Sequence, residues 1–218
     1  KYAKAKKPFV ILKLAMSLDG KIATSSGDSK YITGREARKY VHQIRNDVDA
    51  VMVGINTVIR DNPLLDSRLI KGKNPIKVIV DSSLKISEKA KVLKDPSKVI
   101  IATTKKAPKR KIDKLHLKGI TVLTLKPQKG LVSLKELMTE LGKSEITSVM
   151  IEGGAELSGN AIKENMVDKI LMFSAPKIIG NGLGPIKNLG IKKVNKAIKL
   201  KDTSTKNIGK DVLVTGYL

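Results

Sequence analysis

The stretch TSVMIEGGAELSGNAIKEN, residues 147–165, decides how the chain folds. Its first residues, Thr147 to Ile151, are rich in apolar and β-branched side chains and predict a buried strand. Gly153 and Gly154 then permit a tight turn, and the residues from about Ala155 to Asn165 are expected to form a helix. A strand that leads through a glycine turn into a helix is the building unit of α/β folds, so this stretch predicts that class.

The N-terminal part of the chain predicts the same arrangement. Phe9 to Ser17 (FVILKLAMS) is apolar enough for a central strand, and Leu18 to Lys21 supplies a turn at its end. Thr33 is expected to cap a helix that begins near Gly34 and ends at about Asn46, with Glu36 completing a capping box. Residues 1–7 are expected to be a flexible lead-in to this first strand.

Further strands are predicted through the middle and the end of the chain. Ala50 to Gly54 (AVMVG) is a short buried strand, followed by a helical turn that Asn56 or Thr57 caps and Pro63 ends. Strands are also expected at Ile76 to Asp81, Lys98 to Thr103, Ile120 to Leu125, Lys169 to Ser174, Lys196 to Lys201 and Val212 to Gly216. A helix is expected from Ser133 to Leu141, where Gly142 stops it, and a solvated loop from Lys105 to Lys114. Helices between strands require right-handed crossovers and a parallel sheet, whereas the helix-free end favours antiparallel strands. The sequence therefore predicts one mixed α/β domain over residues 1–218.

The composition excludes several classes of protein. With 41% apolar residues among 218, the chain can fill a core. No apolar run approaches the ~18 residues of a membrane span. The absence of Cys excludes disulfides, thiolate metal ligands and cysteine nucleophiles, and neither His42 nor His116 has metal-ligand spacing, so no metal is expected. We expect a cytoplasmic protein in a reducing compartment that binds no membrane.

The chain is strongly basic, since 43 Lys and Arg against 20 Asp and Glu give a formal charge of +23. Only six of the basic residues are arginine, and aromatic residues make up 3%, so the side chains that read nucleobases or stack on them are scarce. Nucleic-acid binding is therefore the less favoured explanation of the charge. Lysine enrichment is common in thermophile proteins, and a positive field also attracts anionic ligands.

Candidate functional residues lie where strands end and helices begin. At Glu152 to Glu156 the paired glycines would let a phosphate approach the start of a helix, although tight packing of helix on strand explains them equally well. Thr57 and Asp61 could bind a phosphate or a hydroxyl group, while plain capping is the commoner role of such a Thr. Arg45 and Arg68, two of few arginines, suit a phosphate, but Arg45 could instead complement a helix end.

Taken in order, these segments resemble the reductase domain of riboflavin biosynthesis, a family with a dihydrofolate-reductase-like fold. The resemblance is carried by Lys13 to Lys21 (KLAMSLDGK), Gly27 to Thr33 (GDSKYIT), Gly54 to Pro63 (GINTVIRDNP), Ile79 to Ser82 (IVDS), Ile151 to Gly154 (IEGG) and Ala175 to Gly180 (APKIIG), together with Arg45, Leu65 and Arg68. These motifs occur in this order over about residues 9–216, which makes the resemblance specific. It implies a three-layer α/β/α fold with a mixed, mainly parallel central sheet and antiparallel C-terminal strands.

The resemblance implies an oxidoreductase that uses NADPH to reduce a phosphoribosylaminopyrimidine to its ribitylamino form. The positions that match cofactor contacts are Tyr31, where relatives often have Trp, Thr57, Asp61, Ser82, Gly153, Gly154, Ala155, Glu156, Leu157 and Ser158. The positions that match substrate contacts are Ser29, Arg45, Leu65, Arg68 and Glu152. NADH could replace NADPH, because no arginine stands out as a reader of the 2′-phosphate.

A lysine-rich chain without Cys resembles the archaeal, stand-alone branch of the family, because the zinc deaminase fused to bacterial relatives requires Cys. This implies 2,5-diamino-6-(5-phosphoribosylamino)pyrimidin-4(3H)-one as the substrate. The alternatives are a reductase of the deaminated 5-amino-6-(5-phosphoribosylamino)uracil, a reductase of dihydrofolate, and a nucleic-acid-binding protein. A homodimer is also implied, and the apolar segment Val212 to Val214 could bury an edge against a second copy.

The reaction requires C1′ of an opened glycosylamine within ~3–3.5 Å of the nicotinamide C4 atom. Arg68, with Arg45 nearby, is expected to hold the 5′-phosphate and Glu152 the polar pyrimidine edge. Lys13 is the candidate that assists opening of the sugar ring, with Asp19 as its rival, although Lys13 could equally be a strand lysine whose charged end reaches solvent. The sequence thus predicts one pocket that seats a nicotinamide nucleotide beside a phosphorylated sugar.

Overall fold

The structure, a computed structural model, describes residues 2–218, and by its internal contacts the chain divides into two units. Unit 1 comprises the N-terminal residues to Phe9 together with Arg45–Met150. Unit 2 comprises Val10–Ile44 and Ile151–Leu218. The boundaries fall inside β1 (Phe9–Ser17), α2 (Arg35–Asp47) and β9 (Ser148–Glu152). That residues 1–218 form a single domain stays a prediction.

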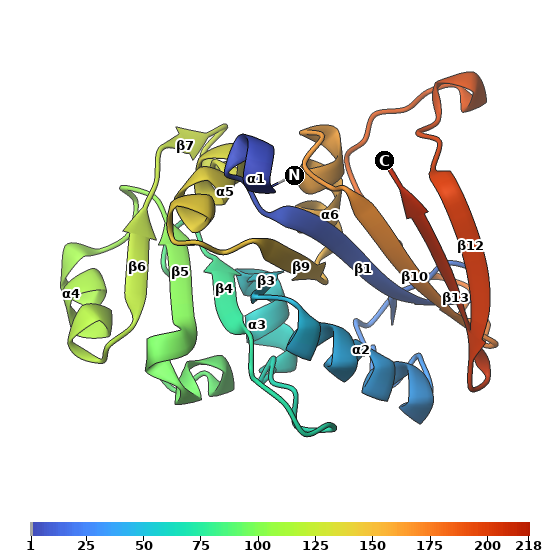
Figure 1. Cartoon of the computed structure of the whole chain (residues 1–218), viewed down its shortest axis with the longest axis horizontal. Helices are drawn as coiled ribbons and strands as arrows, with labels where there is room; N and C mark the ends of the chain where they lie inside the picture. Colours follow the sequence, from blue (N-terminus) through green and yellow to red (C-terminus); the bar gives the residue numbers. More distant parts are fainter. Residues whose placement is uncertain (1) are drawn as a thin grey trace. The chain divides into compact units, whose positions relative to one another are not determined.

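Unit 1 is built on adjacent parallel strands, which Figure 1 shows side by side in the order β3 (Ala50–Gly54), β4 (Ile76–Val80), β5 (Val99–Thr103) and β6 (Thr121–Thr124). β3 is buried from Ala50 to Val53, as expected of a parallel strand that is covered on both faces. The helices of this unit are α1 (Tyr2–Ala5), α3 (Ile55–Asp61), α4 (Lys109–Leu117), α5 (Leu134–Lys143) and the 3₁₀ turns η1 (Lys91–Lys94) and η2 (Pro96–Lys98), and its remaining strands are the short pair β7 (Pro127–Gln128) and β8 (Leu131–Val132).

Unit 2 combines parallel and antiparallel pairing. β1 runs parallel to β10 (Lys169–Ala175), β10 pairs antiparallel with β13 (Asp211–Tyr217), and β12 (Lys201–Ile208) pairs antiparallel with β13 (Figure 1). The other elements are α6 (Ala155–Lys163), the 3₁₀ turn η3 (Val194–Lys196) and the short antiparallel pair β2 (Ala23–Thr24) and β11 (Gly182–Leu183). The predicted mixed sheet, mainly parallel with antiparallel strands at its C-terminal end, is confirmed.

The start of α2 differs from the prediction. The helix begins at Arg35, and the carbonyl of Gly34 accepts the first helical hydrogen bond from the Arg38 N–H at 3.2 Å, so Gly34 and not Thr33 is the N-cap residue. The N–H of Gly34 is satisfied by the carboxylate of Asp211, which accepts it at 2.7 Å. The capping box predicted at Thr33 is wrong because a buried carboxylate from β13, remote in sequence, caps this end.

The basic segment from Lys105 to Lys114 was expected to be a loop, and this prediction is wrong from Lys109 onward. Pro108 is the N-cap residue of α4, where a residue without an N–H costs nothing. The helix buries Leu115 completely, and the half-buried Lys111 donates from its Nζ atom to the carbonyls of Leu84 and Ile86 at 2.7 and 2.6 Å. The other charged side chains of the helix are exposed. Two other elements also begin elsewhere than predicted. Gly54 and not Asn56 or Thr57 is the N-cap residue of α3, and the strand predicted at Lys196 to Lys201 is β12, which begins at Lys201.

Gly142 does not stop α5, which continues to Lys143. A Cβ atom on Gly142 would lie 2.0 Å from the carbonyl oxygen of Lys6, so the glycine is needed for the close approach of the N-terminal segment. The expected lead-in forms the short helix α1 from Tyr2 to Ala5, and the Tyr2 hydroxyl donates to the Gly142 carbonyl at 3.1 Å; residue 1 lies outside the described part.

Within residues 2–218, no helix combines the length and the apolar character that crossing a bilayer requires.

Gly159 in α6 makes a stability prediction possible. A Cβ atom there would lie 1.8 Å from the carbonyl oxygen of Lys187, whose N–H donates to the Ala155 carbonyl at 3.0 Å. We expect Gly159→Ala to destabilise the fold by about 1–3 kcal/mol, because overpacking outweighs the better helix propensity of alanine. The measurement is urea unfolding, with Gly184→Ala as the control, since a Cβ atom at Gly184 meets nothing within 4 Å. Equal stability of the two variants would contradict the packing argument.

Candidate active site

Lys13 and Glu152 form a mostly buried ion pair in unit 2. Lys13 lies in the middle of β1, Glu152 is the last residue of β9, and the Lys13 Nζ atom is 3.9 Å from the Glu152 Oε2 atom. Their side chains are 16% and 9% exposed. A lysine and a carboxylate held together with little water around them are suited to moving a proton or to binding a polar ligand. The structure therefore brings together two of the three residues expected to be catalytic.

The turn after Glu152 leads directly into the N-terminus of α6. Gly153 has φ of 83° and Gly154 has φ of 84° with ψ of 102°, conformations that residues with a Cβ atom rarely adopt. Gly154 is the N-cap residue and provides no side-chain hydrogen bond to the helix. A helix start with backbone N–H groups and a positive dipole end suits an anion such as a phosphate. These features fit the nucleotide phosphates that the sequence predicts here.

The remaining predicted residues of this turn differ in exposure. Ala155 is half-buried, Glu156 is exposed, and Leu157 and Ser158 are buried. The Ser158 hydroxyl is fully buried and has no hydrogen-bond partner within the described residues. A buried hydroxyl without a partner costs free energy, so a ligand or a water molecule at this helix would satisfy it.

Tyr31 presents an aromatic ring that is 66% exposed, and the Arg38 guanidinium lies over it at 4.2 Å from the ring centroid. Arg38 also donates to the Thr33 carbonyl at 2.9 Å, which fixes the guanidinium. The Tyr31 carbonyl accepts a hydrogen bond from Lys177 Nζ at 2.7 Å. Ser29, two residues before Tyr31, is half-buried. An exposed ring held by a cation on its face is a suitable stacking surface for a flat ligand.

Asp19 lies in the turn after β1 and is exposed. Its carboxylate accepts hydrogen bonds from the Ser17 hydroxyl and from the N–H groups of Ile179 and Gly180, at 2.6, 3.1 and 2.8 Å. The Ser17 hydroxyl, followed by the backbone N–H groups, lowers the pKa of Asp19 to about 2. The group is therefore ionised at neutral pH, with both oxygens already engaged.

In unit 1, Thr57 is half-buried in the first turn of α3, and Asp61 is the last residue of that helix. Ser82 follows β4, and its hydroxyl oxygen accepts a hydrogen bond from the Val132 N–H at 3.0 Å. A hydroxyl group that accepts one bond still has its own proton to donate. Ser82 can therefore hydrogen-bond a ligand while it keeps this contact.

Arg45 and Arg68 are both tied to Asp66 in unit 1. Arg45 Nη1 donates to the Asp66 carbonyl at 2.9 Å, and the Arg68 guanidinium is paired with the Asp66 carboxylate. The Arg68 side chain is 54% exposed, and an exposed ion pair contributes little, so a phosphate could replace this carboxylate. Leu65 is buried and has φ of 54°, a left-handed conformation that costs about 1–3 kcal/mol and is often found at functional sites.

The structure thus joins predicted residues in pairs: Lys13 with Glu152 in unit 2, and Arg45 with Arg68 through Asp66 in unit 1. Sequence reasoning missed Asp66, Arg38 and Lys177. Asp66 stands two residues before Arg68, which is a weak signal, whereas nothing in the sequence links Lys177 to Tyr31. The single pocket expected for all the predicted residues stays a prediction.

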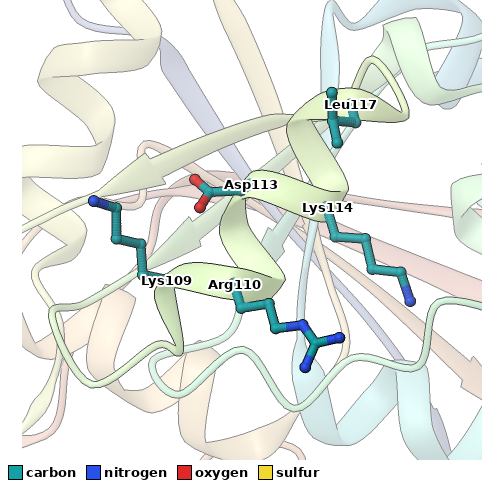
Figure 2. Close-up of a pocket in the computed structure, with 5 residues that line it drawn as sticks. All are labelled: Lys109, Arg110, Asp113, Lys114 and Leu117. Atoms are coloured by element: carbon teal, nitrogen blue, oxygen red, sulfur yellow. The ribbon is translucent and has the colours of Figure 1, made fainter.

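Figure 2 shows an open hollow on the surface of α4, lined by Lys109, Arg110, Asp113, Lys114 and Leu117. All five residues come from one helix, and none of them is a predicted site residue. Lys114 is already paired with Glu88 at 2.9 Å. The hollow contains no buried charged group and is not the candidate active site.

Comparisons with known proteins give the family. The model of the RibD C-terminal domain family matches residues 8–214. Riboflavin biosynthesis protein RibD of Actinobacillus pleuropneumoniae is 38% identical over 217 residues, which cover 98% of this chain and 57% of that protein. The chain therefore spans little more than half the length of this curated relative. The 2,5-diamino-6-ribosylamino-4(3H)-pyrimidinone 5′-phosphate reductase of Aquifex aeolicus is 36% identical over 202 residues, 89% of each chain.

Solved structures agree with the predicted fold. The Thermotoga maritima diaminohydroxyphosphoribosylaminopyrimidine deaminase/5-amino-6-(5-phosphoribosylamino)uracil reductase superposes with a TM-score of 0.84 at 32% identity, over 99% of this chain and 58% of that one. Dihydrofolate reductase of Enterococcus faecalis superposes with a TM-score of 0.56 at 10% identity, over 96% of this chain and 95% of that one, which is a likeness of fold alone. The predicted dihydrofolate-reductase-like α/β fold is confirmed.

Proposed function

The chain belongs to the RibD C-terminal domain family, and from this we propose that it is an NADPH-dependent reductase of riboflavin biosynthesis. Its substrate would be 2,5-diamino-6-(5-phosphoribosylamino)pyrimidin-4(3H)-one, whose ribosyl side chain is reduced to the ribitylamino form. The Aquifex aeolicus relative, which carries the name of this reductase, supports the proposal because it aligns with this chain over 89% of both lengths.

One observation carries the proposal: the Lys13–Glu152 pair lies directly before the glycine turn and the N-terminus of α6. Glu152, the partner of Lys13, is thereby followed directly by the start of a helix that suits a phosphate. A reduction with a nucleotide cofactor needs both functions close together.

We assign the residues of the chain as follows. The nicotinamide supplies the hydride when the cofactor is bound. Lys13 donates a proton to the ring oxygen of the sugar as the ring opens, and Glu152 stabilises the lysine charge and accepts hydrogen bonds from the amino groups of the pyrimidine. Arg68, with Arg45 held beside it by Asp66, binds the 5′-phosphate in place of the Asp66 carboxylate.

We propose the following residues as contacts of the cofactor. Gly153, Gly154 and the first turn of α6 would bind its phosphates, and the Tyr31 ring would stack on a flat part of it. The hydroxyl groups of Thr57 and Ser82 would donate to its ribose or phosphate oxygens, and the Asp61 carboxylate would accept from a ribose hydroxyl. We propose NADPH as the cofactor, with NADH as the alternative.

The test is the loss of NADPH absorbance when the purified chain is mixed with each candidate substrate in turn. We expect oxidation with the diaminopyrimidinone nucleotide. The second candidate is 5-amino-6-(5-phosphoribosylamino)uracil, which the name of the Thermotoga maritima relative favours. A higher kcat/KM on the uracil would reverse the assignment of the substrate, and no oxidation with either nucleotide would overturn the proposed function.

We further propose a homodimer that forms along β12. This strand stands at the end of the strand order, and all its residues except Ile208 are exposed. Exposed edge strands with free N–H and C=O groups readily pair with another chain. The edge expected at Val212 to Val214 is wrong, because β13 is paired on both sides, with β10 and with β12. A molar mass of one chain in light scattering would refute the dimer.

A further inference from the structure

Asp19 joins two segments that are far apart in the sequence. Its Oδ1 atom accepts hydrogen bonds from the Ser17 hydroxyl at 2.6 Å and from the Ile179 N–H at 3.1 Å, and its Oδ2 atom accepts from the Gly180 N–H at 2.8 Å. The Ser17 hydroxyl in turn accepts from the Lys21 N–H at 2.9 Å. One exposed carboxylate therefore connects the turn after β1 to the segment after β10.

Backbone hydrogen bonds hold the same two segments together. The Leu18 N–H donates to the Lys177 carbonyl and the Ile22 N–H to the Leu183 carbonyl, both at 2.8 Å. The only regular structure described between Pro176 and Leu183 is the two-residue strand β11. The placement of this segment thus depends on a few individual bonds, of which those to Asp19 are charge-assisted.

The clamped segment reaches Tyr31 through Lys177. The Lys177 Nζ atom donates to the Tyr31 carbonyl at 2.7 Å, while the Arg38 guanidinium lies over the Tyr31 ring at 4.2 Å. The main chain and the ring of Tyr31 are therefore fixed from two sides. Lys177 is only two residues before Ile179, so a shift of the segment at Ile179 and Gly180 moves Lys177 as well.

We infer that Asp19 is a positioning residue: its carboxylate clamps the segment 176–180 so that Lys177 holds Tyr31 in place as a cofactor contact. This inference rests on the proposed function, since it takes Tyr31 to bind the cofactor. It replaces the expectation that Asp19 competes with Lys13 as the proton donor. The low pKa of Asp19, about 2, supports a clamp, because a carboxylate ionised at neutral pH has no proton to give.

The test uses Asp19→Asn, which keeps the shape but loses the charge and one acceptor oxygen. We expect KM for NADPH to rise about tenfold, as for the loss of a charge-assisted hydrogen bond, with kcat within about twofold. Amide hydrogen exchange at Ile179 and Gly180 should accelerate even without cofactor. Asp113→Asn, which removes an exposed carboxylate on α4, is the control and should change neither quantity.

A second variant checks the route through Lys177. Lys177→Met should raise KM for NADPH to a similar extent. KM of the double variant should not exceed the higher of the two single-variant values, because both changes release the same contact. If the two increases in KM for NADPH were additive in free energy, Asp19 would not act through Lys177. A fall in kcat of Asp19→Asn with an unchanged KM for NADPH and an altered pH profile of kcat would overturn the clamp in favour of a proton role.

The outcome is separable from that of the proposed function. If the wild-type protein neither binds nor oxidises NADPH, the proposed function fails, while the exchange rates at Ile179 and Gly180 still decide whether Asp19 is a clamp. If the wild-type protein is active and Asp19→Asn leaves both KM and the exchange rates unchanged, the clamp fails and the proposed function stands.

Discussion

Lys13→Met is expected to lower kcat by about 10²- to 10⁴-fold, the range that a positioned proton donor contributes. Methionine keeps the length of the buried side-chain stem, so the change removes chiefly the ammonium group. The ammonium is 3.9 Å from the Glu152 carboxylate, and the pair is mostly buried. KM for NADPH should change little, because the cofactor is bound by other residues. Steady-state kinetics of NADPH oxidation give both constants.

Lys39→Met, at an exposed position of α2, is the matched control and should retain full activity. Thermal unfolding of Lys13→Met must accompany the kinetics, because a buried carboxylate that loses its cation is costly. A folded Lys13→Met protein with undiminished kcat would show that Lys13 is only a strand lysine that reaches towards solvent.

Gly154→Ala is expected to raise KM for NADPH by about tenfold to a hundredfold. The residue has φ of 84° and ψ of 102°, where a Cβ atom is strained by about 1–3 kcal/mol. We expect the turn to relax by rotating the first N–H groups of α6 away from the proposed position of the nucleotide phosphates. Each 1.4 kcal/mol corresponds to about a tenfold change in affinity. Fluorescence titration with NADPH measures the binding directly.

Gly190→Ala serves as the control for strain alone. Gly190 also has positive φ, 71°, and a Cβ atom there meets nothing within 4 Å. It should lose a comparable amount of stability without losing affinity for NADPH. Equal affinities of the wild-type and Gly154→Ala proteins would mean that the paired glycines serve the packing of helix on strand and not the cofactor.

Most strands could be predicted because burial on both faces leaves a plain signal of apolar, β-branched runs, as at Ala50 to Gly54. The strand predicted at Lys196 to Lys201 lies N-terminal to β12 as the structure has it. The residues of β12 are polar and exposed, so they give no apolar signal, and pairing with β13 sets the position of the strand. α4 was missed because charge dominates its sequence and only Leu115 is buried. The start of α2 depends on Asp211, a partner that local sequence cannot show.

In the candidate active site, too, features set by local sequence could be predicted, whereas contacts between remote segments could not. The glycine turn before α6 could be predicted, because two adjacent glycines stand between a strand pattern and a helix pattern. In the structure both glycines have positive φ. The contacts that join remote segments were not predictable. The motifs assign Lys13 and Glu152 to one expected pocket but do not show that the two side chains pair, and nothing in the sequence connects Asp19 to Gly180. Motif resemblance supplied the residue types, whereas the pairing of those residues required the fold.

Under the proposed function, this chain transfers a hydride from NADPH to C1′ of the phosphoribosylaminopyrimidine. The most direct measurement is mass spectrometry of the product formed with NADPH that carries deuterium at C4 of the nicotinamide, prepared in each of its two stereoisomers. We expect one deuterium at C1′ of a ribitylamino product from one stereoisomer and none from the other. Turnover that yields an unlabelled product from both, or no ribitylamino product at all, would contradict it.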